Sequence, residues 1–328
     1  MSYRLIGAEL SPYSVKVRSY LRYKQLPHQW INRGPASQDE FQKHAKLPLI
    51  PLLITPDGQG LQDSTPIIEA LEAQHPQPSI HPDDPVAAFV SALVEEYGDE
   101  WGNKPMFHYR WRRDVDAQSG AERIVSGSMP DLAGAAKDKA VAGVKERMVS
   151  RLSFVGSSDA TAPLIEASLA RVLAILERHL ASRPYLFGGR PAFGDFGLFA
   201  QLYECSTDPT PGAIMRDTAP NTLAWIARML DPRAEGAFES WDSLKATLTP
   251  LLRDEIAAVF LPWTRANAAA VAAGEATFSV QLPDGPFSQE TQKYHARSLA
   301  ALGKKYAEAA RDPAVPAALA EAGVRLDG

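Results

Sequence analysis

The run Ser11-Pro12-Tyr13-Ser14 has residue types and a position that suit the stabilisation of an anion. It follows a short apolar segment, residues 3–7, that is typical of a buried strand, and it opens a helical pattern over residues 14–23. A helix N-terminus offers unpaired N–H groups and a partial positive charge, and a serine hydroxyl adds one more donor. Such a place favours a bound thiolate over a thiol. Because serine is also a favoured N-cap, simple capping of the helix is the alternative interpretation.

Two further groups of residues lie where predicted strands begin or end. Ile50-Pro51 opens a strand, and a cis proline there would expose backbone groups of the preceding residue to a ligand. A trans proline that merely begins the strand is the alternative. Asp63-Ser64 joins a strand to a helix, where the hydroxyl and helix start suit a small carboxylate and Asp63 suits an ammonium. The pair therefore fits an α-amino-acid head group, with N-capping by Ser64 as the alternative.

The elements that must position these residues alternate between strand and helix. The turn signal Pro56-Asp57-Gly58 predicts that the strands on either side of it pair as an antiparallel hairpin. The predicted order is β-α-β, then a poorly regular stretch, then β-β-α. The remaining predicted strands lie at residues 28–31, 50–55 and 60–63, and a helix runs from residue 64 to 72.

The rest of the chain has a helical pattern. Prolines between residues 74 and 85 indicate a linker, so we predict domains at residues 1–76 and 86–328 joined by residues 77–85. Residues 119–158 are rich in Ala, Gly and Ser and predict only weak helix and loop, and residues 277–282 predict a short strand and turn. Residues 193–203 are uniformly apolar and predict a central buried helix. Other helices are predicted near residues 89–101, 164–180, 222–230, 241–252, 256–273 and 289–310.

Composition excludes several classes of protein. The 328 residues are 45% hydrophobic and 22% charged, which is ordinary for a soluble globular chain. A net charge of -5 disfavours a nucleic-acid partner. The single cysteine, Cys205, excludes an internal disulfide, a CxxC pair and a cysteine-rich zinc site, and the histidines show no metal-ligand spacing. With no secretory signal and no apolar run of the roughly 20 residues that a membrane span requires, we expect a cytoplasmic protein without metal or membrane partner.

The motifs and their order resemble those of the cytosolic glutathione transferases over roughly residues 3–230. The residues from Ser11 to Arg18 resemble the first-helix motif of the serine-type classes, such as tau and zeta. In that family the serine hydroxyl stabilises the thiolate of glutathione, and Ser11 is the matching position. The resemblance also assigns Tyr13 to glutathione binding. It implies an α/β thioredoxin-like N-terminal domain followed by an all-α C-terminal domain.

The resemblance extends to the other two motifs. Ile50-Pro51 resembles the family's Val-Pro pair, whose proline is cis and whose backbone contacts the cysteinyl part of glutathione. Asp63-Ser64 resembles the pair that grips the γ-glutamyl group. Asp195 matches the aspartate that stabilises folding at the start of the buried helix.

Several positions depart from the family pattern. Leu49 stands where the family often has a basic residue, so the glycine carboxylate of glutathione would need another partner, such as Lys43 or Lys46. Ala192 replaces the serine or threonine that usually caps the buried helix, which predicts the loss of that cap. The chain after about residue 231 is longer than is usual for the family, and its sequence indicates no function.

Aromatic residues early in the helical part match the region that lines the family's co-substrate pocket. We assign Tyr97, Trp101 and His108 to that pocket, with core packing as the alternative and His108 as a candidate acid or base. The basic run Arg110, Arg112 and Arg113 is interpreted as a solvated face, since Asp114 and Asp116 offset it. Cys205 is interpreted as an inert core thiol.

The resemblance implies an enzyme whose glutathione thiolate attacks a small apolar electrophile, working as a homodimer. Ser14 occupies the place of a thioredoxin's second cysteine, which excludes dithiol exchange because serine forms no mixed disulfide. The alternative is a protein of the same fold that binds a ligand or a protein partner without catalysis.

Overall fold

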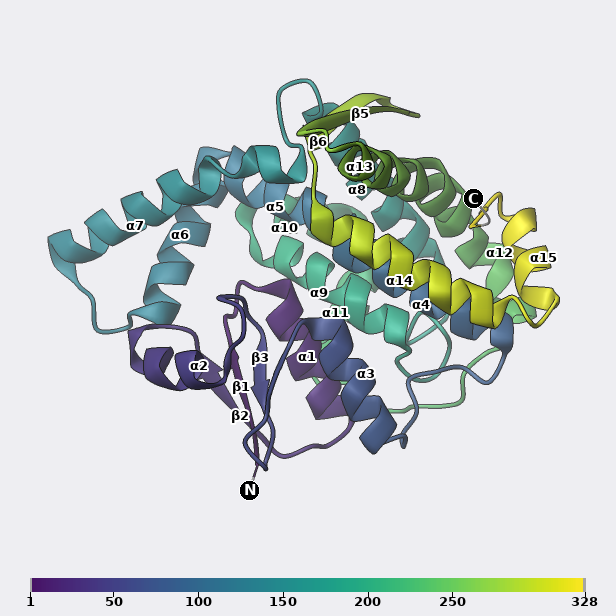
Figure 1. Cartoon of the computed structure of the whole chain (residues 1–328), viewed down its shortest axis with the longest axis horizontal. Coiled ribbons are helices and arrows are strands. Elements are labelled where there is room, and N and C mark those ends of the chain that lie inside the picture. Colours follow the sequence, from purple (N-terminus) through teal and green to yellow (C-terminus); the bar gives the residue numbers. More distant parts are fainter. Residues whose placement is uncertain (1, 327–328) are drawn as a thin grey trace.

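A small mixed sheet with flanking helices precedes a large helical part in the computed structural model, which describes residues 2–326 (Figure 1). The sheet order is β2-β1-β3-β4, with β1 parallel to β2 and antiparallel to β3, and β3 antiparallel to β4. The thioredoxin-like arrangement and the predicted hairpin are thereby confirmed. The elements of this part are β1 (Tyr3–Gly7), α1 (Pro12–Tyr23), β2 (His28–Asn32), the 3₁₀ turn η1 (Pro35–Ser37), α2 (Gln38–His44), β3 (Leu52–Ile54), β4 (Gly60–Gln62) and α3 (Ser64–Gln74).

Each face of the sheet is covered because successive strand residues point to opposite sides. Leu5 and its pairing partner Leu53 belong to the main core, together with residues of α1 and α3. Ile6 and Leu52 point the other way and pack with Phe41 of α2. The stretch that was predicted to be poorly regular therefore contains a helix, and that helix covers the second face.

The second part consists of helices around α9, which lies in the middle of the molecule (Figure 1). Its elements are α4 (Pro85–Glu100), α5 (Asn103–Arg112), α6 (Asp114–Ser128), α7 (Gly134–Val149), the 3₁₀ turn η2 (Leu152–Val155), α8 (Ala162–His179), α9 (Phe193–Thr207), α10 (Pro209–Thr218), α11 (Pro220–Met229), α12 (Trp241–Leu251), the π-helical segment η3 (Leu252–Phe260), α13 (Leu261–Ala273), β5 (Thr277–Leu282), β6 (Gly285–Glu290), α14 (Lys293–Ala309) and α15 (Ala314–Glu321).

Helix α9 is buried, as its apolar sequence predicts, and it also joins the two parts. It lies so close to α4 that a Cβ on Gly98 would be 2.7 Å from the backbone N of Leu198. On its other side the ring of Phe196 packs edge-on against Tyr20 of α1, with ring centroids 5.7 Å apart. One hydrophobic core therefore runs from the sheet into the helical part.

Asp195 binds the backbone at the start of α9, where the usual serine or threonine cap is missing. Its carboxylate accepts hydrogen bonds from the backbone N of Ala192 at 2.9 Å, from the backbone N of Leu186 at 2.8 Å and from Trp225 Nε1 at 2.9 Å. Burial raises the pKa of Asp195 to about 7. The side-chain cap from residue 192 is absent, as predicted, because alanine has no hydroxyl, but Asp195 still binds the backbone N of that residue.

Other predicted elements also change in the structure. Residues 119–158 contain most of α6 and all of α7, because Val125, Val141 and Trp111 give these helices a small core of their own and alanine favours helix. Figure 1 shows the two helices projecting from the rest of the molecule. The helix predicted from residue 289 begins at Lys293, since residues 285–290 pair with β5 instead. No predicted helix corresponds to α5, α10 or α15.

The continuous helix over α12, η3 and α13 is long and apolar enough to cross a membrane by length and composition. The core helix of a soluble protein passes the same test, and 44% of the apolar window of this helix is buried inside the molecule. Trp263 is fully buried and packs edge-on against Trp101. Glu255, also fully buried, accepts hydrogen bonds from Tyr97, Ser168 and Arg171.

Helix α4 presents two buried pairs of carboxylates to different neighbours. Glu95 and Asp99 face α1, where Lys16 Nζ lies 2.5 Å and 2.6 Å from their oxygens. Glu96 and Glu100 face α14, where they bond to Ser298 and His295. A carboxylate pair four residues apart lies on one side of a helix, so the spacing places each pair against one neighbour.

Replacing Lys16 tests the first pair. We expect Lys16→Met to lower the free energy of unfolding by roughly 3–5 kcal/mol, because two buried carboxylates lose their cation. The loss should be larger at about pH 8 than at about pH 5, since protonation relieves the unpaired charge. Urea unfolding at both pH values measures it. Lys245→Met, which removes an exposed ion pair with Asp242, is the control and should change nothing measurable. An equally small loss for Lys16→Met would contradict the argument.

The second pair predicts a pH dependence of stability. Burial and the neighbouring carboxylates raise the pKa values of Glu96 and Glu100 to about 8. The native state therefore binds more protons than the unfolded chain between about pH 4 and 8, so stability falls as the pH rises through that window. We expect the urea midpoint to decline from about pH 5.5 to 8.5, and to decline less in Glu96→Gln.

The exposed Glu122→Gln exchange is the matched control for Glu96→Gln and should retain the slope of the unmodified chain. A Glu96→Gln variant with that same slope would show that Glu96 does not titrate in this window.

Candidate functional site

The strand register gathers the predicted site residues at one edge of the sheet. Ile6 near the end of β1 pairs with Leu52 at the start of β3, and Leu52 pairs with Gln62 at the end of β4. The chain therefore leaves β1, enters β3 and leaves β4 at neighbouring points. We call Ser11, Ile50, Pro51, Asp63 and Ser64, which lie just beyond these points, the Ser11 edge.

Ser11 is the half-buried N-cap of α1. Its Oγ accepts a hydrogen bond from the backbone N of Ser14 at 3.3 Å, while its carbonyl oxygen accepts from the same N at 3.0 Å. The shared donor and the longer distance make the side-chain bond the weaker of the two. Within residues 2–326 no acceptor receives the Ser11 hydroxyl proton, so the hydroxyl keeps a donor for a ligand.

The loop before Ser11 is fastened to the helical part. The carboxylate of Glu9 accepts two hydrogen bonds from Arg18, at 2.6 Å and 2.9 Å, and a third from Tyr203 of α9 at 2.8 Å. The carbonyl of Leu10 accepts from Arg110 NH1 at 3.1 Å. Both residues that immediately precede Ser11 are thus held by other elements, which restricts where its hydroxyl can lie.

Arg110 is a positioning residue that sequence reasoning missed. It is 2% exposed and forms ion pairs with Glu204 at 2.7 Å and Asp208 at 2.8 Å, so the interpretation of this basic run as a solvated face is wrong for Arg110. The side chains of Arg112 and Arg113 are partly exposed, which agrees with that interpretation. Asp114 and Asp116, which are close in the sequence, had indicated that the basic run is exposed to solvent. The partners of Arg110 come instead from α9 and from the residue that follows it.

The second serine of the motif points away from the Ser11 edge. Ser14 is fully buried, and its Oγ has no hydrogen-bond partner among the described residues. A Cβ on Gly7 would lie 2.8 Å from that Oγ, so Gly7 leaves the space that Ser14 fills. The two serines therefore have different surroundings, although they stand in one turn of helix.

Tyr13 reaches from α1 to the helical part. Its hydroxyl donates to the carbonyl oxygen of Asp99 at 3.0 Å and accepts from Asn103 Nδ2 at 3.0 Å. Burial and the nearby carboxylates of Asp99 and Glu100 raise the pKa of the phenol. Its predicted role in glutathione binding stays a prediction, and the structure gives its hydroxyl two internal partners.

The peptide bond between Ile50 and Pro51 is cis, as was predicted, and it lies directly before β3. The loop in front of it is held by Gln62, which the sequence analysis assigned no role. Gln62 Oε1 accepts from the backbone N atoms of Lys46 and Leu47, and its Nε2 donates to the carbonyls of Leu47 and Leu49. Leu49 is 61% exposed, and the side chain of Lys46 is also exposed, as is that of Lys43 in α2.

Asp63 and Ser64 lie at the start of α3. Asp63 has φ 74°, in the left-handed region that a non-glycine residue rarely adopts, and such residues cluster at ligand sites. Its exposed carboxylate accepts a hydrogen bond from Tyr294 of α14. Ser64 is buried, and its Oγ lies 3.4 Å from Asp99 Oδ2. Sequence reasoning gave no hint that Tyr294 would lie here.

The residues assigned to a co-substrate pocket lie in the core of the helical part. Tyr97, Trp101 and His108 are all at most 1% exposed. Their polar atoms have internal partners: Glu255 for Tyr97 at 2.9 Å, Ser168 for Trp101 at 2.9 Å, and Ser157 for His108 at 2.8 Å. The pocket assignment stays a prediction, and their surroundings agree with the core-packing alternative.

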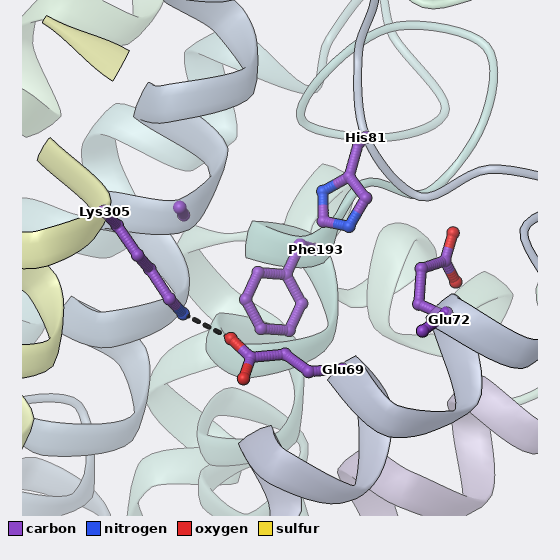
Figure 2. A pocket seen from close by; sticks show the side chains of 7 residues that line it. Glu69, Glu72, His81, Phe193 and Lys305 are labelled. Carbon is purple, nitrogen blue, oxygen red and sulfur yellow. Dashed lines mark ion pairs between the residues drawn. The ribbon is translucent and has the colours of Figure 1, made fainter. Parts of the chain in front are cut away.

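Two surface cavities lie apart from the Ser11 edge and contain none of its residues. One, of about 330 Å³, is lined by Glu69, Glu72, His81, Phe193 and Lys305 among others, and Figure 2 shows Lys305 paired with Glu69 there. The other, of about 860 Å³, lies between α6 and α7. In residues 2–326 no cluster of His, Cys, Asp and Glu could hold a metal ion. Burial raises the pKa of Cys205, which keeps that thiol protonated.

Family models match both parts of the chain. "Glutathione S-transferase, N-terminal domain" matches residues 5–79, which contain the whole Ser11 edge, and "Glutathione S-transferase, C-terminal domain" matches residues 144–228. A sequence search among curated proteins finds no match.

Solved structures with similar folds include several glutathione transferases. One from Methylobacterium radiotolerans, in complex with glutathione sulfonate, is 24% identical with a TM-score of 0.45, covering 73% of this chain and 97% of its own. A tau-class enzyme from mango is 17% identical with a TM-score of 0.42, covering 75% and 96%. A β-etherase from Sphingobium is 20% identical with a TM-score of 0.46, covering 70% and 95%. The sheet and the helical part therefore have the glutathione transferase fold, and the two family models match residues within each part.

Proposed function

We propose that the chain binds glutathione at the Ser11 edge and activates its thiol for attack on a small apolar electrophile. The observation that carries the proposal is the register that brings Ser11, the cis Ile50–Pro51 bond and the left-handed Asp63 to one edge of the sheet. Ser11 would then bind the thiol, the Ile50–Pro51 backbone the cysteinyl part and Asp63 the γ-glutamyl head group. These three places follow one another along the edge as the three groups do in glutathione. The matched N-terminal family model, which contains the whole Ser11 edge, supports this assignment.

The proposed catalytic residue is Ser11. Its free hydroxyl proton would donate to the glutathione sulfur, and the N-terminus of α1 would add its partial positive charge. Lowering a thiol pKa from about 8.5 toward 6.5 raises the ionised fraction at pH 7 from a few per cent to most of the thiol. The proposal includes the serine-type character of the enzyme, its kinship with the tau and zeta classes and a cytoplasmic location, where the free Cys205 fits a reducing environment.

The proposed homodimer must accommodate the C-terminal helix α14. Ser298 bonds to Glu96 of α4, and Lys305 Nζ lies 2.6 Å from Glu69 of α3, so α14 covers part of both helices. A second subunit therefore cannot pack directly on the parts of α3 and α4 that α14 covers. Sedimentation of the full chain measures the assembly directly.

A second candidate function is binding of a ligand or protein partner without catalysis. Two observations favour it: the Ser11 hydroxyl already serves as a helix cap, and the aromatic residues assigned to a co-substrate pocket have their polar atoms bonded inside the core. The two candidates differ in whether bound glutathione is ionised and reacts.

Glutathione binding is the first test of the proposal. Calorimetric titration of the full chain with glutathione should show one site per chain. The binding heat should be smaller for an analogue that lacks the γ-glutamyl group or the thiol. No binding up to ~10 mM glutathione, which corresponds to less than about 3 kcal/mol of binding free energy, would contradict the proposed function.

Ser11→Ala is the second test. We expect the pKa of the bound thiol, followed by the ultraviolet absorbance of the thiolate, to rise by about one unit or more, and turnover of an aryl halide to fall roughly 10- to 100-fold, because the sulfur loses a donor. Ser14→Ala is the matched control, since its buried hydroxyl faces Gly7 and not the ligand. If the pKa of the bound glutathione thiol is unchanged in Ser11→Ala, the proposed role of Ser11 is wrong.

A further inference from the structure

The first turn of the C-terminal helix α14 lies against the Ser11 edge. The phenol oxygen of Tyr294 lies 3.1 Å from Asp63 Oδ2 and 3.3 Å from Asp63 Oδ1. These residues are 231 positions apart in the chain. Figure 1 shows α14 running across α4 with its first turn above the sheet part. The segment for which the sequence indicated no function therefore contacts the residue that would hold the amino-acid head group of glutathione.

Neighbouring residues of α14 hold Tyr294 in this place. His295 Nδ1 bonds to Glu100, and the His295 ring packs edge-on against Trp263 with centroids 4.8 Å apart. One turn later, Ser298 donates to Glu96. The carboxylates of Glu96 and Glu100 are buried, so breaking these bonds would leave buried polar groups unpaired. Moving Tyr294 away from Asp63 would thus cost far more than its own hydrogen bond.

The Tyr294 hydroxyl acts as a donor to Asp63. Partial burial and the nearby carboxylates of Glu100 and Asp63 raise the pKa of this phenol, so it keeps its proton. A single O–H shared between the two oxygens of Asp63 leaves most of the lone pairs of that carboxylate available. An ammonium group can therefore bind to Asp63 while Tyr294 remains in place.

We propose that Tyr294 is a specificity-determining residue of the glutathione site, which orients the Asp63 carboxylate and forms the wall of the γ-glutamyl end. This inference rests on the proposed function, because it takes the γ-glutamyl ammonium of glutathione as the ligand of Asp63. The chain thereby supplies this wall from its own C-terminal helix. Thiols with a free γ-glutamyl group fit such an end, whereas a group added to the amino nitrogen would meet the tyrosine ring.

Tyr294→Phe tests the hydroxyl, with glutathione as the probe and the full chain as the protein. We expect the dissociation constant measured by calorimetry to rise about fivefold, since a partly exposed hydrogen bond to a charged group is lost. The pKa of the bound thiol should not change, because the sulfur lies at the opposite end near Ser11. A general loosening of α14 would disturb both quantities, and the thiol pKa therefore separates positioning from a merely structural effect.

Lys305→Gln is the matched control on the same helix. It breaks the ion pair with Glu69 (Figure 2) and leaves the first turn of α14 intact, so glutathione affinity should stay within a factor of two of the unmodified chain. Tyr294→Ala, which also removes the ring, should weaken binding at least as much as Tyr294→Phe.

The outcomes separate the two proposals. If the unmodified chain binds glutathione but both Tyr294 variants bind within a factor of two of it, the role of Tyr294 is wrong and the proposed function stands. Tighter binding by Tyr294→Ala would also overturn the inference, since it would show that α14 competes with the ligand. If the unmodified chain binds no glutathione, the proposed function fails and this inference fails with it.

Discussion

The buried amine of Lys16 is the contact on which the arrangement of the site depends. It projects from α1, the helix that Ser11 caps, and bonds to Thr65 in the first turn of α3 and to Glu95 and Asp99 of α4. Burial by itself would lower its pKa, but the two carboxylates outweigh burial and raise it, so the amine stays charged. Three helices that come from both parts of the chain are therefore tied together at one point. Because the N-terminal ends of α1 and α3 form the Ser11 edge, this contact sets their separation.

A second layer of contacts fixes the loop and the head-group end. Arg110 holds the carbonyl of Leu10, and Gln62 holds the loop before Pro51, so the backbone on both sides of the proposed sulfur position is restrained by buried or half-buried side chains. Side chains that act through a neighbouring backbone in this way orient a site without touching its ligand. The helical part thus does more than cover the sheet, since α5 and α9 anchor the loop that carries Ser11.

The C-terminal extension is integrated into the core and is no loose tail. Trp263 packs between Trp101 and Phe260, and α14 places His295 and Ser298 on the carboxylates of α4. The acidic residues of α4 therefore serve two neighbours: one pair binds the lysine of α1, and the other pair binds α14. Through α4, the extension and the sheet part are fastened to two neighbouring faces of one helix, which explains how residue 294 comes to lie beside residue 63.

The sequence by itself determined the order of the strands and helices of the first part except α2, the hairpin, the buried α9 and the three motifs of the Ser11 edge. These features depend on local signals: alternation, turn residues, a proline before a strand and a serine before a helix. Tertiary structure alone decided that Arg110 holds Leu10 and that Tyr294 meets Asp63, residues that lie 100 and 231 positions apart. It also decided that Tyr97, Trp101 and His108 are buried. No local pattern encodes these placements, because the free energy of such contacts comes from packing elements together and from pairing the charges that packing buries.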